Sequence, residues 1–268
     1  MFDPILLEAH NPSPMTGRGN NTYLIVGSRG SAALIDAGVG HARHLEDLGR
    51  AIDQQGAALM DVLVTHGHAD HASGAPAIAG AHPGVRFAKY PWPSEDGKYG
   101  VEWDTLAEGQ VMVIGDIPLV VLRTPGHSPD HVVFWHMESG TVFAGDLVIL
   151  GGSVMIHSSR GGDLAQYLSS LDYLRSLKPR RILPAHGPPI DEPDAVLTAY
   201  LDHRRMREQQ VLAALKAGND TVQAVAESIY HDLDPALVPA AQENVRAHLE
   251  KLKNESRAVN DDGGWRLP

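Results

Sequence analysis

The sequence predicts an α/β protein in which two β-sheets are covered by helices and followed by a smaller, winged-helix-like C-terminal domain. Short strand patterns alternate with helical patterns up to about residue 193, and mainly helical patterns follow. The 268 residues, of which 43% are hydrophobic and 21% charged, suit one large or two unequal globular domains. We place the larger domain at residues 1–199 and the winged-helix-like domain at residues 200–268.

The first part of the chain consists of short strands and two helices. The apolar and β-branched runs that predict its strands are Ile5–Glu8, Thr22–Gly27, Ala32–Asp36 and Val62–Val64. Ser28-Arg29-Gly30 resembles a hairpin turn between the second and third of these strands. Helical spacing of apolar residues predicts a helix at His41–Gln55 and another that begins with Ser73–Ala79.

The middle of the chain continues the alternation. Leucines 164, 168, 171 and 174 have helical spacing and predict a helix at Asp163–Leu177. The predicted strands are Val85–Ala88, Val111–Ile114, Leu119–Leu122, Val132–Trp135, Val142–Ala144 and Arg181–Leu183.

Three helical patterns and a small hairpin make up the C-terminal part. The second helix is expected at Thr221–Tyr230, where Asp220 and Gln223 have the spacing of a capping box. The third keeps apolar residues at helical steps from Val238 to Leu252. Asp261-Asp262-Gly263-Gly264 can then turn a hairpin, which completes a winged-helix-like order.

Composition limits both the type of metal site and the partners. The chain has no cysteine, so a transition-metal site must use histidine and carboxylate ligands. The net charge of −11 argues against a broad, nonspecific nucleic-acid surface. No run of eighteen apolar residues occurs and the first residues lack the features of a secretory signal, so we expect a cytoplasmic protein without a membrane partner.

The segment His66-Gly67-His68-Ala69-Asp70-His71 places three imidazoles and a carboxylate directly after a buried strand. A catalytic zinc ion uses about three protein ligands and a water, so this many donors indicate two ions or idle residues. His127, Asp146 and His186 follow at strand ends or in turns. Each of these three alone could be a turn, cap or core residue, but together with the cluster they indicate a metal centre.

These residues, in this order, resemble the metallo-β-lactamase superfamily, whose fold is a four-layer αββα sandwich. The resemblance implies that His66, His68 and His127 bind one metal, that Asp70, His71 and His186 bind a second, and that Asp146 bridges them. Asp36, in Leu34-Ile35-Asp36-Ala37-Gly38, matches a position outside the ligand set that orients the ligand loops. An ordinary turn residue explains Asp36 equally well.

Further motifs resemble the β-lactamase-like protein 2 group, whose animal member is a mitochondrial endoribonuclease. The motifs are Asn11-Pro12-Ser13-Pro14-Met15-Thr16, Asn21-Thr22-Tyr23-Leu24, His203-Arg204-x3-Glu208-Gln209-Gln210 and the winged-helix-like tail. The chain departs from the group in Gly151–Gly162, a loop rich in glycine and serine that carries His157 and Arg160.

The predicted activity is that of a dinuclear metal-dependent hydrolase. Two divalent cations, expected to be Zn²⁺, would supply a metal-bridging hydroxide at neutral pH. Asp70 is the candidate for orienting that hydroxide and accepting a proton. His131 and His157 are the candidates for the acid that protonates the leaving group, although a loop or supporting role suits each of them better.

Three functions remain open from the sequence. The first is cleavage of single-stranded RNA, for which the tail offers Arg204, Arg205, Arg207, Lys251 and Lys253. The second is hydrolysis of a small ester-like substrate, namely a thioester, a lactone or, weakly, a β-lactam. The third is a DNA reader with a structural metal. A tail that does not bind nucleic acid would serve packing or formation of a homodimer.

Overall fold

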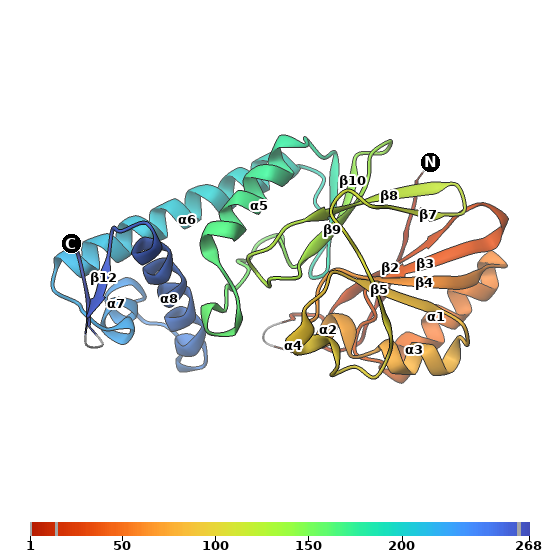
Figure 1. The fold of residues 1–268 in the computed structure, drawn as a ribbon, viewed down its shortest axis with the longest axis horizontal. Coiled ribbons are helices and arrows are strands. Elements are labelled where there is room, and N and C mark those ends of the chain that lie inside the picture. Colours follow the sequence, from red (N-terminus) through yellow and green to blue (C-terminus); the bar gives the residue numbers. More distant parts are fainter. Residues whose placement is uncertain (1, 14–15, 262–263) are drawn as a thin grey trace.

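The computed structural model describes residues 2–13, 16–261 and 264–268 and contains two facing β-sheets (Figure 1). The first sheet has six strands in chain order, antiparallel at its start and parallel from β3 onward. Its strands are β1 (Ile5–Glu8), β2 (Asn21–Val26), β3 (Ser31–Ile35), β4 (Ala58–Val64), β5 (Arg86–Lys89) and β6 (Trp103–Thr105).

The second sheet has five strands in the order β11-β10-β9-β8-β7. They are β7 (Val111–Ile114), β8 (Ile117–Arg123), β9 (Val132–His136), β10 (Thr141–Gly145) and β11 (Arg181–Pro184). Alternate side chains of both sheets meet in one apolar core, where Ile25, Ile35 and Leu63 of the first sheet face Phe134 and Phe143 of the second. This core holds the sheets together, so that polar loops can gather along one shared edge.

Helices cover the outer face of each sheet, which gives four layers in the order αββα. Helices α1 (Ala42–Gln55) and α3 (Ala75–Ala81) pack on the first sheet, and α5 (Leu164–Ser176) and α6 (Pro193–Lys216) pack on the second. Short helices α2 (Ala69–Ala72) and α4 (Pro93–Asp96) lie in the loops at the shared edge (Figure 1). The predicted two-sheet α/β class is therefore confirmed.

The helix predicted to begin at Ser73 differs in detail from the observed structure. The chain forms α2 before Ser73 and α3 after Gly74. A Cβ atom on Gly74 would lie 2.2 Å from the carbonyl oxygen of Ala37, so the chain at Gly74 packs against a neighbouring loop. Tertiary contact, which apolar spacing cannot report, sets this helix boundary.

The C-terminal unit contains α7 (Val222–Ile229), the 3₁₀ turn η3 (Pro235–Leu237), α8 (Val238–Asn254) and a hairpin of β12 (Val259–Asp261) and β13 (Gly264–Arg266). The predicted turn residues Asp262 and Gly263 lie outside the described residues. The predicted capping box is wrong: Thr221, not Asp220, caps α7 by accepting from the Ala224 N–H at 3.1 Å. Gln223 instead bonds to Glu227.

Helix α6 runs without interruption through the predicted domain boundary at residue 200 (Figure 1). Leu197 and Leu201, in its first half, belong to the core of the second sheet, whereas Val211 and Leu215, in its second half, belong to the core of the C-terminal unit. One helix thus contributes to both cores, and the boundary at residue 200 stays a prediction.

Arg204 joins the two units where they meet. Its side chain is 2% exposed, lies over the Tyr167 ring at 5.4 Å, and donates to Asn244 Oδ1 of α8 at 3.1 Å. Its other terminal nitrogen donates to the Ser153 hydroxyl and to the Val154 carbonyl. The guanidinium therefore connects α6 and α8 to the loop that follows β10.

Within the described ranges, no helix combines the length and apolar character needed to cross a lipid bilayer.

Candidate metal centre

The loop after β4 carries four of the predicted ligands. β4 is buried along its last four residues, and the chain then turns through Thr65 and His66 into α2. Because α2 starts right after His68, it carries Asp70 and His71 on its single turn, and His71 is fully buried. The buried strand end thus fixes where the imidazoles point.

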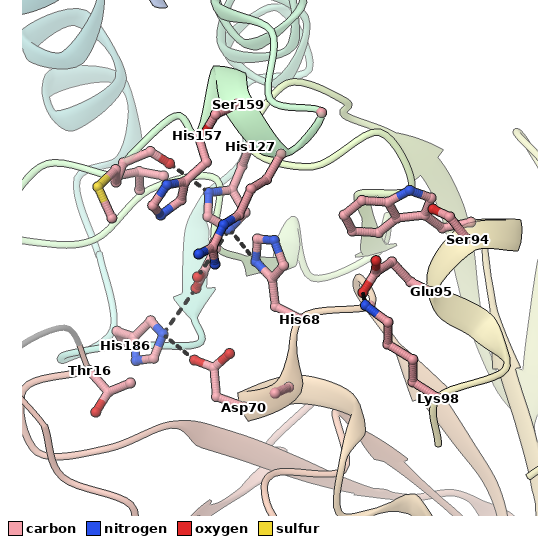
Figure 2. Close-up of a pocket in the computed structure, with 18 of the residues that line it drawn as sticks. Thr16, His68, Asp70, Ser94, Glu95, Lys98, His127, His157, Ser159 and His186 are labelled. Atoms are coloured by element: carbon pink, nitrogen blue, oxygen red, sulfur yellow. Dashed lines mark hydrogen bonds and ion pairs between the residues drawn. The ribbon is translucent and has the colours of Figure 1, made fainter. Parts of the chain in front are cut away.

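His66, His68 and His127 form the first ligand cluster. The Nδ1 atom of His68 lies 2.9 Å from His66 Nε2 and 2.9 Å from His127 Nε2, so the three nitrogens point to one place. Figure 2 shows His68 and His127 side by side. His127 comes from the loop between β8 and β9. The sequence-predicted residues of the first metal are therefore brought together.

Asp70, His71, Asp146 and His186 form the second ligand cluster, with donor atoms all within 4.8 Å of one another. Asp70 Oδ2 lies 3.6 Å from His186 Nε2 and 3.7 Å from His71 Nε2. His186 follows β11 and lies beside Asp70, which comes from the loop after β4 (Figure 2). These are the residues predicted for the second metal.

Asp146, at the end of β10, faces both clusters. Its Oδ1 atom lies 3.2 Å from His186 Nε2 and 3.5 Å from His71 Nε2, while its Oδ2 atom lies 3.5 Å from His127 Nε2. One carboxylate thus turns an oxygen to each group of ligands. This is the arrangement expected of a residue that bridges two metal ions.

The donor set fits cations better than it fits protons. Burial lowers the pKa of His66 well below its usual range and the pKa of His68 to about 3, so both rings are uncharged at neutral pH. Their facing lone pairs at 2.9 Å then repel unless a cation lies between them. Asp146 Oδ1 is buried and makes no hydrogen bond of acceptable geometry with the described residues, which also leaves it available to a cation.

The second cluster is dominated by its carboxylates. Burial opposes the charge of Asp146, yet His71 and His186 outweigh it and hold the pKa of Asp146 well below its usual range. Burial likewise opposes protonation of His186, but Asp146 and Asp70 raise its pKa to about 10. The carboxylates are therefore ionised and supply the negative charge that a divalent cation requires.

Backbone and hydroxyl acceptors fix the orientation of the ligand rings. His127 Nδ1 donates to the Met155 carbonyl at 2.9 Å, and His186 Nδ1 donates to the Gly19 carbonyl at 3.3 Å. The Thr65 hydroxyl, which donates to Asp36, accepts from His66 Nδ1 at 3.1 Å. In each ring the nitrogen away from the cluster is engaged by an acceptor, so the nitrogen that faces the cluster is the one that can bind a metal.

Asp36 lies beneath the second cluster. It is 2% exposed, accepts the Thr65 N–H at 2.7 Å and accepts from His71 Nδ1 at 2.9 Å. Its backbone is left-handed, with φ of 63°, a conformation that aspartate and asparagine tolerate better than most residues. These contacts are those of a residue that orients a ligand, as the resemblance implied.

We expect Asp36→Asn to weaken metal binding by about 10–100-fold, the usual effect of losing an outer partner of a ligating histidine. Asparagine keeps the size and the backbone conformation but loses the charge that faces His71. Titration against a chromogenic chelator would measure the change, with Asp53→Asn on the exposed surface of α1 as the matched control. Equal metal affinity in the two variants would contradict this role.

Two supporting residues, Asn20 and Asp130, escaped the sequence reasoning, and a third, His131, takes the supporting role that the sequence favoured for it. The Asn20 amide donates to Asp70 Oδ2 at 3.2 Å, and Asp130 Oδ2 accepts the Gly67 N–H at 2.7 Å. His131 Nε2 accepts the Asp146 N–H at 3.1 Å, and its Nδ1 lies 2.8 Å from the Thr124 hydroxyl. Because both ring nitrogens are engaged and the ring is buried, His131 is a support for Asp146 and not a leaving-group acid.

The Asn21-Thr22-Tyr23 motif also serves the centre. The Asn21 amide donates to the Gly187 carbonyl at 2.8 Å, and the Tyr23 hydroxyl donates to the Pro184 carbonyl at 2.8 Å. Both bonds hold the loop that carries His186. In the earlier motif, Pro14 and Met15 lie outside the described residues.

A cavity of about 960 Å³ opens over the two clusters (Figure 2). Its floor contains the ligands His68, Asp70, His127, Asp146 and His186. Its walls mix apolar and polar side chains, among them Trp92, Lys98, Tyr99, Ile149, Val154, Met155, His157 and Arg160. The ligands are thus accessible to a substrate of moderate size, and His157 remains a candidate proton donor at the wall.

Two family models match the chain in the same order as its two structural units. One, described as the Metallo-beta-lactamase superfamily, matches residues 15–186. The other, described as the Beta-lactamase associated winged helix domain, matches residues 221–265.

Curated relatives cover most of the chain. The Beta-lactamase-like protein 2 homolog of Drosophila melanogaster is 35% identical over 92% of this chain and 86% of its own length. The homolog of the same name from Caenorhabditis elegans is 30% identical over 94% of this chain and 84% of its own length. An atrochrysone carboxyl ACP thioesterase of Aspergillus chevalieri is 31% identical over 83% of this chain and 71% of its own length.

Solved structures share the whole fold. A metallo-beta-lactamase family protein from Thermus thermophilus superposes with a TM-score of 0.80 at 21% identity, covering 99% of this chain and 98% of that chain. A beta-lactamase domain protein from Burkholderia ambifaria gives 0.81 at 21% identity, covering 99% and 91%. At this identity the likeness extends to the fold alone.

Proposed function

The chain belongs to the metallo-β-lactamase superfamily of hydrolases, and from this premise we propose that its two ligand clusters hold a pair of divalent cations, with zinc expected. The observation that carries the proposal is Asp146, whose two oxygens face different clusters. When bound, such a pair supplies a hydroxide at neutral pH and stabilises charge on the attacked carbonyl or phosphoryl group.

The residues of the chain would divide the remaining tasks. His66, His68 and His127 would hold the first cation, and Asp70, His71 and His186 the second, with Asp146 shared. Asp70, fixed by the Asn20 amide and partly exposed to the cavity, would orient the attacking water and accept its proton. His157 lines the wall of the same cavity, from which it could protonate a leaving group.

As substrate we propose a small acyl compound, namely a thioester or a lactone. The cavity wall offers apolar surface from Trp92, Ile149 and Val154, which suits an acyl chain. A relative named as a thioesterase aligns with 83% of the chain. This favours acyl transfer to water over the other reactions that the same centre can serve.

The tail gives little support to a nucleic-acid surface. Among its basic residues, Arg204 is buried at the junction of the two units, and Lys251 pairs with Glu208 at 2.6 Å. Arg207 lies over the Tyr230 ring at 4.5 Å. These side chains pack the C-terminal unit. Single-stranded RNA nevertheless remains the second candidate, since Trp92 and Tyr99 in the cavity offer rings on which bases can stack.

One experiment tests both candidates. We would purify the protein, measure metal per chain, and assay turnover of a thioester, a lactone, a chromogenic cephalosporin and a fluorogenic single-stranded RNA. Asp70→Ala is expected to lower the turnover rate by a factor of about 10² or more. Asp53→Ala, on the surface of α1, should leave the rate unchanged. Turnover of RNA alone would replace the acyl proposal, and fewer than two metals with an active Asp70→Ala variant would refute the mechanism.

A further inference from the structure

The 3₁₀ turn η2 (Ser158–Arg160) places a free positive charge at the mouth of the cavity. Arg160 lines the cavity and is exposed, and its guanidinium makes neither a hydrogen bond nor an ion pair with any residue that the structure describes. Lys98, across the cavity, is already paired with Glu95 at 2.5 Å. Arg160 is therefore a cation of the cavity wall whose charge is not neutralised by a neighbouring side chain.

The backbone of the turn is held on several sides, although the arginine head is free. The Arg160 and Gly162 N–H groups both donate to the His157 carbonyl at 2.9 Å. Ser159 donates to Glu243 of α8 twice, from its hydroxyl at 3.0 Å and from its N–H at 3.4 Å. Gly161, with φ of 90°, lies against Pro129 and the Trp92 ring. The turn thus has a fixed base and carries one unpaired guanidinium.

The other charged side chains described at the cavity already have partners, so Arg160 is the cation that is available to a bound anion. The carboxylates on the cavity floor, Asp70 and Asp146, face the histidines of the two clusters, and Glu95 faces Lys98. The chain as a whole carries a net charge of −11 and would repel anions elsewhere. An anionic group that enters the cavity therefore finds its complementary side-chain charge at Arg160, whose planar fork matches a carboxylate or a phosphate.

From these observations we infer that Arg160 anchors an anionic oxygen group of the substrate, so that the scissile acyl bond lies over the ligand clusters. This inference rests on the proposed acyl hydrolase function and narrows its substrate to a carboxylate-bearing or phosphate-bearing thioester. It also gives the C-terminal unit a task in catalysis, because Glu243 of α8 holds the turn on which Arg160 stands.

Three thioesters with a shared chemistry test the anchor. Pentanoyl-N-acetylcysteamine is neutral, glutaryl-N-acetylcysteamine adds a carboxylate to the acyl group, and pentanoyl-coenzyme A adds phosphates to the leaving group. Arg160→Gln is expected to raise KM by about 10–100-fold for one of the anionic substrates and to leave the neutral one within 2-fold. The affected substrate identifies a carboxylate or a phosphate as the anchored group.

A matched control and a second variant sharpen the result. Arg50→Gln removes an exposed arginine of α1, outside the cavity, and should change none of the three KM values. Glu243→Ala frees the turn without touching the guanidinium, so it should raise the same anionic KM by a smaller factor, about 3-fold. Equal effects of Arg160→Gln on all three substrates, or no effect on any of them, would overturn the anchor.

A binding measurement separates this inference from the proposed function. Glutarate titrated calorimetrically into metal-loaded wild type and Arg160→Gln requires no turnover. If no thioester is hydrolysed but glutarate binding weakens about 10-fold or more in Arg160→Gln, the acyl function fails and the anchor stands. If thioesters are hydrolysed, glutarate binds both proteins equally and Arg160→Gln leaves the KM for pentanoyl-coenzyme A unchanged, the anchor fails and the function stands.

Discussion

Asp146→Asn is expected to lower kcat/KM by at least about 10³-fold, more than the 10–100-fold that loss of a supporting partner costs. The amide keeps the shape of the side chain but replaces one of its two charged oxygens, so it can no longer turn a carboxylate oxygen to both clusters. Metal analysis should show fewer than two ions per chain. Activity and metal content are measured on the same preparation, so that the two losses can be compared directly.

The matched control for this variant is Asp191→Asn. Asp191 is exposed and pairs with Arg181 on the surface, so its replacement should leave both readouts at wild-type values. An Asp146→Asn protein that kept two metals and wild-type turnover would remove the bridging role on which the proposed function depends.

The largest effect on folding is expected from Arg204→Ala. This change leaves the buried Val154 carbonyl and the Asn244 side chain without a donor and opens a cavity beside Tyr167. Together these losses should lower the free energy of unfolding by about 3 kcal/mol or more. At 268 residues such a loss corresponds to a fall in Tm of roughly 6–12 °C in thermal unfolding.

The neighbouring residue supplies the comparison. Arg205 is exposed and, among the residues that the structure describes, pairs with Asp202 alone, so Arg205→Ala should change the free energy of unfolding by no more than about 0.5 kcal/mol. Arg204→Ala should in addition weaken metal binding, because Val154 precedes the Met155 carbonyl that orients His127. If the two variants were equally stable, Arg204 would not connect the units as described.

The candidate ligands could be recognised in the sequence because their signal is local. His66, His68, Asp70 and His71 follow one buried strand within six residues, and the later donors follow apolar runs that read as strands. The position of each donor at a strand end or in a turn indicated a metal centre, and the resemblance to the superfamily implied how the donors divide between two sites. The structure places all seven in two adjoining clusters.

The supporting residues were not predictable, because their partners are distant in sequence. Asp130 meets Gly67 across 63 positions, and Asn20 meets Asp70 across 50 positions. A single polar residue in a turn carries no pattern that distinguishes these contacts from solvation. The short helix α4 and strand β6 were missed for a related reason, since each is only three or four residues long and depends on tertiary contacts.

The continuity of α6 has a consequence for which sequence changes the chain can accept. An α-helix turns about 100° and rises about 1.5 Å with each residue. Deleting one residue between Arg204 and Val211 would therefore rotate the whole C-terminal unit about the helix axis and carry Glu243 away from Ser159. Substitutions at exposed positions such as Arg205 and Gln209 should therefore be tolerated. Insertions or deletions in this stretch of α6 should not be, because the number of residues in it sets the position of the turn at the cavity mouth.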